Sequence, residues 1–290
     1  MFKNITNQYN LILKKGQTVK IILRLIFNMI FLGLLRFKKL LRRINKPIIH
    51  YYAICWNEEK MLPFVFDYYE DIVDRFIIYD NYSNDKTLEL VSKNKKAKAI
   101  QYNTEGKIND EIYLKIKNNV WKKSRGKADY VIVCDIDEIL YHPELNVFLN
   151  DSFKSKYSFF GPNGYEMFSE KFPIYDGKHI ITDIVKNGFS ADKYSKSILF
   201  DPHRIVEINY LPGAHQAFPY GIVKRYESDS LKLFHYKNMG IEYVLNRVSQ
   251  YHSRLSDVNK QKGYGVEYEK EIDTIRNEFQ NGLSKSKEVI

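Results

Sequence analysis

Two acidic residues that follow an apolar run are the first place in this sequence where chemistry can be expected. Residues 131–134 read Val-Ile-Val-Cys, typical of a buried strand, and Asp135, Asp137 and Glu138 come directly after them. Two carboxylates two positions apart can share one hard cation, and Mg²⁺ or Mn²⁺ commonly bridges carboxylates to substrate phosphates. Acids also gather in solvated turns, so the motif alone is weak. It indicates a divalent-cation site and a substrate that carries a diphosphate.

Two further polar clusters follow apolar runs. Residues 76–79 lead into Asp80, with Ser83 and Asp85 close behind, and residues 48–55 lead into Asn57 and Glu58. A carboxylate such as Asp80 can accept a hydrogen bond from a ribose hydroxyl or a base N–H. The segment around Ser83 also fits a helix N-terminus, with Asp85 in the first turn. Both interpretations can hold together.

The elements that must position these clusters alternate between strands and helices. Apolar runs predict strands at 48–55, 75–79, 98–102 and 130–135, and helical periodicity predicts helices at 60–72, 85–93 and 109–123. This order is typical of an α/β fold with a doubly wound, mostly parallel sheet flanked by helices. Ligands of such sheets bind beyond the carboxyl ends of the strands, where the three polar clusters fall. We therefore expect them to meet in one crevice.

The second half of the chain is less regular. Antiparallel strands are expected near 157–160, 197–200 and 231–235, followed by helices near 241–255 and 266–279. No clear linker divides the chain, so we expect an N-terminal segment at 1–46 and one domain at 47–290. That domain would have a nucleotide-binding half at 47–142 and an acceptor half at 143–290.

Three motifs occur together in an order and spacing that resemble one family: Asn57-Glu58-Glu59 with Leu62-Pro63, Asp80-Asn81-x-Ser83-x-Asp85-x-Thr87, and Asp135-x-Asp137-Glu138. The family is that of the GT-A glycosyltransferases related to family 2. The resemblance is strongest over residues 48–142. It extends more loosely to Lys196 and to the His235-Tyr236-Lys237 stretch, which look like elements of a bacterial subgroup related to family 92.

The resemblance implies a nucleotide-sugar donor, with a UDP-sugar as the first expectation, and transfer of the sugar to an acceptor hydroxyl of a glycan or lipid-linked glycan. It also implies a bound Mn²⁺ or Mg²⁺ ion. The metal ligands it implies are Asp135, Asp137 and His235. The residues it implies at the donor are Asn57, Glu58, Asp80, Ser83, Asp85, Asp135, Lys196 and Lys237. Lys237 would neutralise the leaving diphosphate.

Two assignments within this set have open alternatives. His235 ends an apolar run and can equally be structural, and His203 and His215 are further candidates. Inverting transfer needs a carboxylate within hydrogen-bond reach of the acceptor hydroxyl. We assign Glu166 to this role together with Asp137 as the catalytic pair. The other acids weighed for the base are Glu170, Asp183 and Asp192.

The net charge of +10 is located almost entirely at the N-terminus. Residues 1–47 hold eleven of the 45 Lys and Arg residues and no acid, which leaves 34 basic residues against 35 acidic ones. A nucleic-acid-binding protein usually carries its basic stripe on the folded domain, so we expect no nucleic-acid partner.

The segment at 19–35 is apolar except for Lys20, Arg24 and Asn28, which recur every four positions. On a helix they form one polar strip, a pattern typical of an amphipathic helix at an anionic membrane surface. A short membrane span and packing on the catalytic domain are the alternatives. The expected location is cytoplasmic, at the inner face of the cell membrane, with a role in bacterial surface-glycan synthesis.

Two other classes of function compete with the transferase. A haloacid-dehalogenase-like phosphatase would also place Asp135 after an apolar strand, as a nucleophile, but the downstream acidic pair of that fold is missing. A non-catalytic scaffold of a glycan assembly complex would keep the fold and lose transfer. Cys55 and Cys134 are expected to be buried thiols on neighbouring strands rather than a disulfide.

Overall fold

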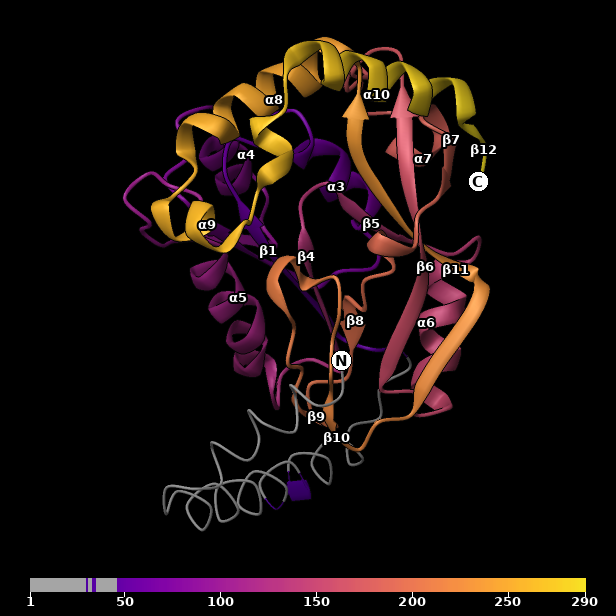
Figure 1. Ribbon diagram of the computed structural model, residues 1–290. Coiled ribbons are helices and arrows are strands. Elements are labelled where there is room, and N and C mark those ends of the chain that lie inside the picture. The colour runs from indigo at the N-terminus through magenta and orange to yellow at the C-terminus, as the bar shows by residue number, and fades with distance from the viewer. Residues whose placement is uncertain (1–29, 31–32, 35–45) are drawn as a thin grey trace, which may run out of the picture.

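The computed structural model describes residues 30, 33–34 and 46–290 (Figure 1). The amphipathic helix expected at 19–35 falls outside these residues except at Ile30, Gly33 and Leu34. Among the described residues, no helix combines the length and hydropathy needed to cross a bilayer.

The first half of the domain is the predicted parallel sheet. Its strands lie in the order β3-β2-β1-β4 and are all parallel. They are β1 (Ile49–Cys55), β2 (Arg75–Asp80), β3 (Ala97–Gln101) and β4 (Tyr130–Asp135). The connecting helices are α3 (Leu62–Tyr68), α4 (Thr87–Lys93) and α5 (Asp110–Asn119), the last continued by the 3₁₀ helix η1 (Val120–Ser124). The α/β fold predicted from the sequence is confirmed.

Helices cover both faces of this sheet because successive side chains of a strand point to opposite sides. Tyr51 in β1 packs in a core layer with residues of α3 and α4, whereas Tyr52 packs in a second layer with Trp121 of η1. Cys55 and Cys134 are buried and free on the neighbouring strands β1 and β4, as expected. Burial raises the pKa of both thiols well above its usual range.

The elements of the second half are β5 (Glu138–Tyr141), α6 (Leu145–Lys154), β6 (Phe159–Ser169), α7 (Ile181–Ile184), β7 (Asn187–Ser190), η2 (Asp192–Tyr194), β8 (Leu199–Phe200), β9 (Ile205–Glu207), η3 (Pro212–Ala214), β10 (Tyr220–Gly221), β11 (Arg225–Met239) and β12 (Lys287–Glu288). Most of these strands extend the sheet in mixed directions, whereas β9 and β10 form a separate two-stranded sheet. Strand β8 runs antiparallel to β4, and β11 runs antiparallel to β5.

The long strand β11 differs from the sequence expectation. It covers fifteen residues. Residues 232–235 pair antiparallel with β5, as expected, and the strand also pairs with β6 in parallel. The exposed and half-buried residues of its first half alternate, which marks a sheet with one open face rather than a short buried strand.

Helices α8 (Ile241–Arg254), α9 (Asp257–Lys262) and α10 (Ile272–Lys285) complete the domain, with η4 (Val266–Glu269) between the last two. The helix expected at 266–279 is divided because Lys270 is extended and ends η4. Figure 1 shows α8 and α10 at one end of the molecule and β9 and β10 at the other.

Candidate active site

A cavity of about 740 Å³ lies at the carboxyl ends of β1 and β4. Asp135 and Asp137 line it from the β4–β5 turn, and residues of α5, α8, η4 and α10 complete its walls. This is the edge of a parallel sheet at which ligands are expected. The sequence-predicted residues among its lining are Glu58, Asp135, Asp137, Glu166, Lys196, His235 and Lys237. The alternative histidine His215 also lines it, whereas His203 does not.

Asp135 is held by two buried lysines. The Lys117 ammonium lies 2.8 Å from each of the two carboxylate oxygens of Asp135. The Lys196 ammonium lies 3.7 Å from Asp135 Oδ2 and contacts Glu138 Oε1. Burial alone would raise the pKa of Glu138, but Lys196 and Lys117 outweigh it, so this pKa lies below its usual value. Both carboxylates are therefore charge-compensated within the protein.

Asp137 is oriented by a different partner. Its Oδ2 lies 3.3 Å from His235 Nε2, and its backbone carbonyl accepts a hydrogen bond of 2.8 Å from the Tyr236 amide. Burial opposes ionisation, yet His235 holds the pKa of Asp137 below its usual value. Strand β11 brings the two together, because His235 pairs with Glu138 across the antiparallel ladder.

The Asp137–His235 pair could supply two ligands of a divalent cation. Two ligands at right angles on a cation, each about 2.1 Å from it, lie about 3 Å apart, close to the 3.3 Å between Asp137 Oδ2 and His235 Nε2. Both oxygens of Asp135 are instead occupied by Lys117. Among residues 46–290 and the three described before them, no group of three or more His, Cys, Asp or Glu side chains could hold a metal. The third predicted ligand, Asp135, contacts Lys117, and the ligand set of Asp135, Asp137 and His235 stays a prediction.

Glu166 lies beside this pair. It is the direct register partner of His235 across the parallel β6–β11 ladder, and its Oε1 accepts a hydrogen bond of 3.0 Å from Asn238 Nδ2. The ammonium groups of Lys193 and Lys237 each lie 3.9 Å from its carboxylate. Burial lowers the pKa of Lys237. The three other acids weighed as the base, Glu170, Asp183 and Asp192, do not line the cavity.

Glu58 is also buried in the lining of the cavity and pairs with Arg247. The Arg247 guanidinium contacts Glu58 Oε1 and donates a 2.9 Å hydrogen bond to the backbone carbonyl of Asn57. Burial raises the pKa of Glu58 to about 7, and Arg247 only partly opposes this rise. The α8 helix is thereby tied to the loop that follows β1.

Glu58 should make the stability of the domain fall as pH rises. Its folded pKa of about 7 exceeds its ordinary value of 4.5, so the native state binds this proton more tightly than the unfolded state does. The free energy of unfolding should decline between these two values, by up to about 3 kcal/mol. Glu58→Gln is expected to remove this decline when urea unfolding is compared at pH 5 and pH 8. The exposed control Glu70→Gln should retain it, and an equal decline in Glu58→Gln would contradict the assignment.

Four sequence-predicted residues lie outside the cavity lining: Asn57, Asp80, Ser83 and Asp85. They join the loop after β1 to the loop after β2. Ser83 Oγ accepts from the Asn57 amide at 2.8 Å, and Asp85 Oδ2 accepts from the Glu59 amide at 3.0 Å. Asp80 is fully buried and accepts from the Ser83 amide at 3.1 Å.

Five basic residues that line the cavity were not singled out by sequence reasoning: Lys117, Lys193, Arg247, Arg254 and Lys270. Lys117, Arg247 and Arg254 come from helices whose sequences look like ordinary surface helices. Arg254 stacks on Trp56, with its guanidinium carbon 3.5 Å from the ring centre, and hydrogen-bonds to Asn81. The only sequence signal is that an acid, Asp135 or Glu58, is expected to require a partner once it is buried.

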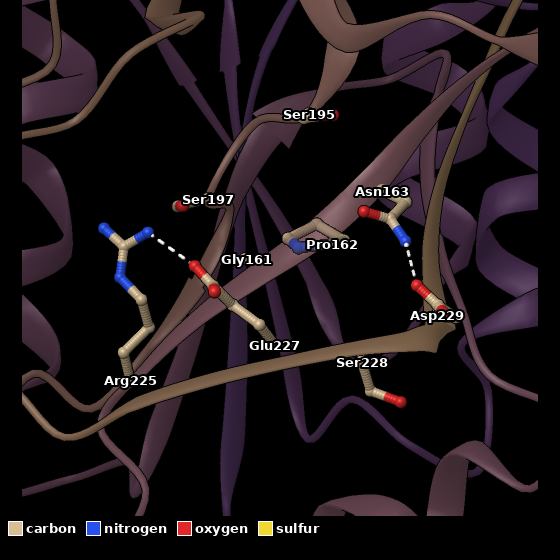
Figure 2. Close-up of a pocket in the computed structure, with 9 residues that line it drawn as sticks. All are labelled: Gly161, Pro162, Asn163, Ser195, Ser197, Arg225, Glu227, Ser228 and Asp229. Atoms are coloured by element: carbon tan, nitrogen blue, oxygen red, sulfur yellow. Dashed lines mark hydrogen bonds and ion pairs between the residues drawn. The ribbon is translucent and has the colours of Figure 1, made fainter.

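A second, polar hollow of about 750 Å³ lies on the other side of the 195–197 segment (Figure 2). Ser195 and Ser197 line it, while Lys196 between them lines the first cavity. Figure 2 shows the Asn163–Asp229 hydrogen bond and the Arg225–Glu227 ion pair at its edge. The two sites therefore share one stretch of chain as a wall.

No protein-family model and no curated protein matches the chain. Among solved structures, TarS of S. aureus (residues 1–349) matches with 12% identity and a TM-score of 0.38, over 71% of this chain and 65% of TarS 1–349. GalNAc-T7 with UDP, GalNAc and Mn²⁺ matches with 8% identity and a TM-score of 0.43, over 83% and 58%. HddC from Yersinia pseudotuberculosis matches with 14% identity and a TM-score of 0.33, over 65% and 93%. The chain thus spans less than two thirds of the length of TarS 1–349 and of GalNAc-T7. All three TM-scores are below 0.5, so these likenesses carry no argument about function. Function must be argued from the chemistry of the site.

Proposed function

We propose that the chain is a GT-A type glycosyltransferase that moves a sugar from a nucleotide-sugar donor to an acceptor hydroxyl. The observation that supports this most is the Asp137–His235 pair, placed beside the Lys117–Asp135 and Lys196–Glu138 pairs at the carboxyl ends of parallel strands. A cation-binding pair next to buried ammonium groups suits a substrate whose leaving group is a diphosphate.

Asp137 and His235 would hold Mn²⁺ or Mg²⁺, and the cation would supply electrostatic stabilisation of the leaving diphosphate. The protein's own cations act alongside it. Lys196 and Lys237 both line the cavity, and their ammonium groups would stabilise charge that develops as the glycosidic bond breaks. Asp135, fixed by Lys117, presents oxygens that can accept from a ribose hydroxyl.

Glu166 would act as the base. Asn238 donates a hydrogen bond to its Oε1, which leaves Oε2 to take the proton of the acceptor hydroxyl. The oxygen of that hydroxyl then attacks the sugar. Asn57, Asp80, Ser83 and Asp85 would support the donor site indirectly, by bracing the loop that carries Glu58 and Trp56.

The phosphatase alternative is disfavoured because the downstream acidic pair of that fold is missing from the sequence. A role in surface-glycan synthesis at the inner face of the cell membrane is part of the proposal. It is motivated by the basic, amphipathic composition of residues 1–46.

Release of free nucleotide tests the proposal without knowledge of the acceptor, because many nucleotide-sugar enzymes can pass the sugar to water. The full chain is incubated with UDP-, GDP- and CMP-sugars and Mn²⁺, and the nucleotide product is measured by chromatography. Turnover of one donor class is expected. Failure to turn over any donor, combined with hydrolysis of a phosphomonoester, would contradict the transferase and support the phosphatase.

The polar hollow offers a place for the part of a glycan acceptor away from the reacting end. Its serine hydroxyls, Asn163 and Asp229 can exchange hydrogen bonds with sugar hydroxyls. The double variant Asn163→Ala with Asp229→Ala is expected to raise KM for an oligosaccharide acceptor about tenfold, because two hydrogen bonds to the bound acceptor are lost. Nucleotide release in the absence of acceptor should not change. An unchanged acceptor KM would remove the hollow from the acceptor path.

A further inference from the structure

A short stretch of chain exposes an unusual amount of apolar surface. Residues 218–223 read Phe-Pro-Tyr-Gly-Ile-Val. The exposed fractions are 50% for Phe218, 42% for Tyr220, 49% for Ile222 and 41% for Val223. Single exposed apolar residues are ordinary, but several together usually mark a binding surface. We call residues 218–223 the apolar finger.

The backbone of the apolar finger is firmly held, so its exposure is a built feature. Tyr220 and Gly221 form strand β10 against β9. The Ile222 amide donates a 2.8 Å hydrogen bond to the Arg204 carbonyl, and the Ile222 carbonyl accepts from Ser158 Oγ at 2.9 Å. At Gly221, where φ is +141°, a Cβ atom would lie 2.1 Å from the Arg204 carbonyl oxygen. The chain is thus pressed against β9 while the apolar side chains remain exposed.

Basic residues lie next to the apolar finger. Lys224 follows it directly and donates to the Ser155 carbonyl at 2.9 Å, which places the 154–156 turn beside it. Lys154, Lys156 and Lys224 are all exposed. The acid Asp151 is paired with Lys154 at 3.3 Å. Exposed apolar side chains flanked by ammonium groups match the two layers of an anionic bilayer surface, acyl chains below and phosphate headgroups above.

The position of the apolar finger in the fold agrees with this chemistry. It lies at the amino ends of the parallel strands, since Ser158, which binds Ile222, immediately precedes β6. The described domain also begins at this end. The carbonyl of Ile48, just before β1, accepts a hydrogen bond from the amide of Asp129, just before β4. The chain ahead of it carries eleven basic residues and no acid. Figure 1 shows β10 at the end of the molecule away from α8 and α10, which cover the cavity.

We propose that the apolar finger inserts into an anionic membrane surface, with Lys154, Lys156 and Lys224 against the lipid headgroups. The catalytic domain then has a membrane contact of its own, in addition to any made by residues 1–45. The cavity at the opposite end of the strands faces away from the bilayer. This arrangement suits an acceptor glycan that extends from the membrane rather than one lying at its surface.

A fluorophore at the apolar finger tests the insertion directly. Val223→Cys can be labelled selectively, because Cys55 and Cys134 are buried, with an environment-sensitive dye on the full chain. Vesicles of phosphatidylcholine with one quarter phosphatidylglycerol should shift its emission to the blue, and pure phosphatidylcholine vesicles should shift it much less. The same dye at Ile174→Cys, a position 88% exposed elsewhere, should not shift with either. An unshifted Val223→Cys label on vesicles that bind the protein would overturn the proposal.

Vesicle sedimentation measures the contribution to binding. The double variant Phe218→Ser with Ile222→Ser is expected to weaken partitioning onto anionic vesicles about tenfold or more, and the matched control Ile174→Ser with Val266→Ser should match the wild type. Equal binding of wild type and double variant would assign all lipid contact to residues 1–45 and overturn the proposal. A lipid-free dimer that the double variant abolishes would also overturn it, by giving this surface to a second copy of the chain.

Discussion

Asp137→Ala is expected to lower the rate of sugar transfer by at least about 100-fold at saturating Mn²⁺. The change removes the carboxylate that lies 3.3 Å from His235 and with it one of the two side chains proposed to hold the cation. The loss should appear in kcat/KM measured on the donor class identified by nucleotide release.

The exposed Asp151→Ala, which removes a carboxylate of the same type on α6, serves as the matched control and should retain full activity. Far-UV circular dichroism should show that both variants are folded. A folded Asp137→Ala protein with activity close to that of the wild type would exclude the Asp137–His235 pair as the cation site.

Glu166→Gln is expected to reduce transfer by about 10²–10⁴-fold, because an amide cannot take the proton of the acceptor hydroxyl. Glutamine keeps the shape of the side chain and can still bond to Asn238, so the effect should fall on kcat. Donor affinity, measured by titration, should change by less than about twofold.

Asp192→Asn is a suitable control for this prediction, since Asp192 was a candidate base in the sequence but does not line the cavity. If Asp192→Asn lost transfer and Glu166→Gln did not, the base would have to be reassigned. If neither variant lost transfer, a retaining mechanism without this base would be favoured.

The parallel half of the fold could be predicted because its signals are local. Strand β4 occupies the predicted range of 130–135, and β1 and β2 begin and end within a residue of their predicted bounds. Each is a short apolar run between polar clusters, so the sequence around each strand suffices. The second half was predicted less well: α6 and β7 were not foreseen, and β11 pairs with β6 in parallel. Strand partners depend on distant parts of the chain, which periodicity does not report.

The same distinction applies to the site. Asp135 and Asp137 could be singled out from type and position, His235 from the family resemblance, and Glu166 as one choice among four acids. All four line one cavity. Their charge partners could not, because Lys117 is 18 residues before Asp135 and Arg247 is 189 residues after Glu58. Only the folded chain shows that the Lys117 ammonium lies 2.8 Å from each oxygen of Asp135.

The most direct measurement is calorimetric titration of the full chain with UDP, GDP and CMP, each with and without Mn²⁺, on the wild type and Asp137→Ala. The account predicts that one nucleoside phosphate binds the wild type, that Mn²⁺ strengthens the binding, and that Asp137→Ala loses this strengthening. Binding of none of the three to the folded wild type, with or without Mn²⁺, would contradict the proposal that this cavity is the donor site of a glycosyltransferase.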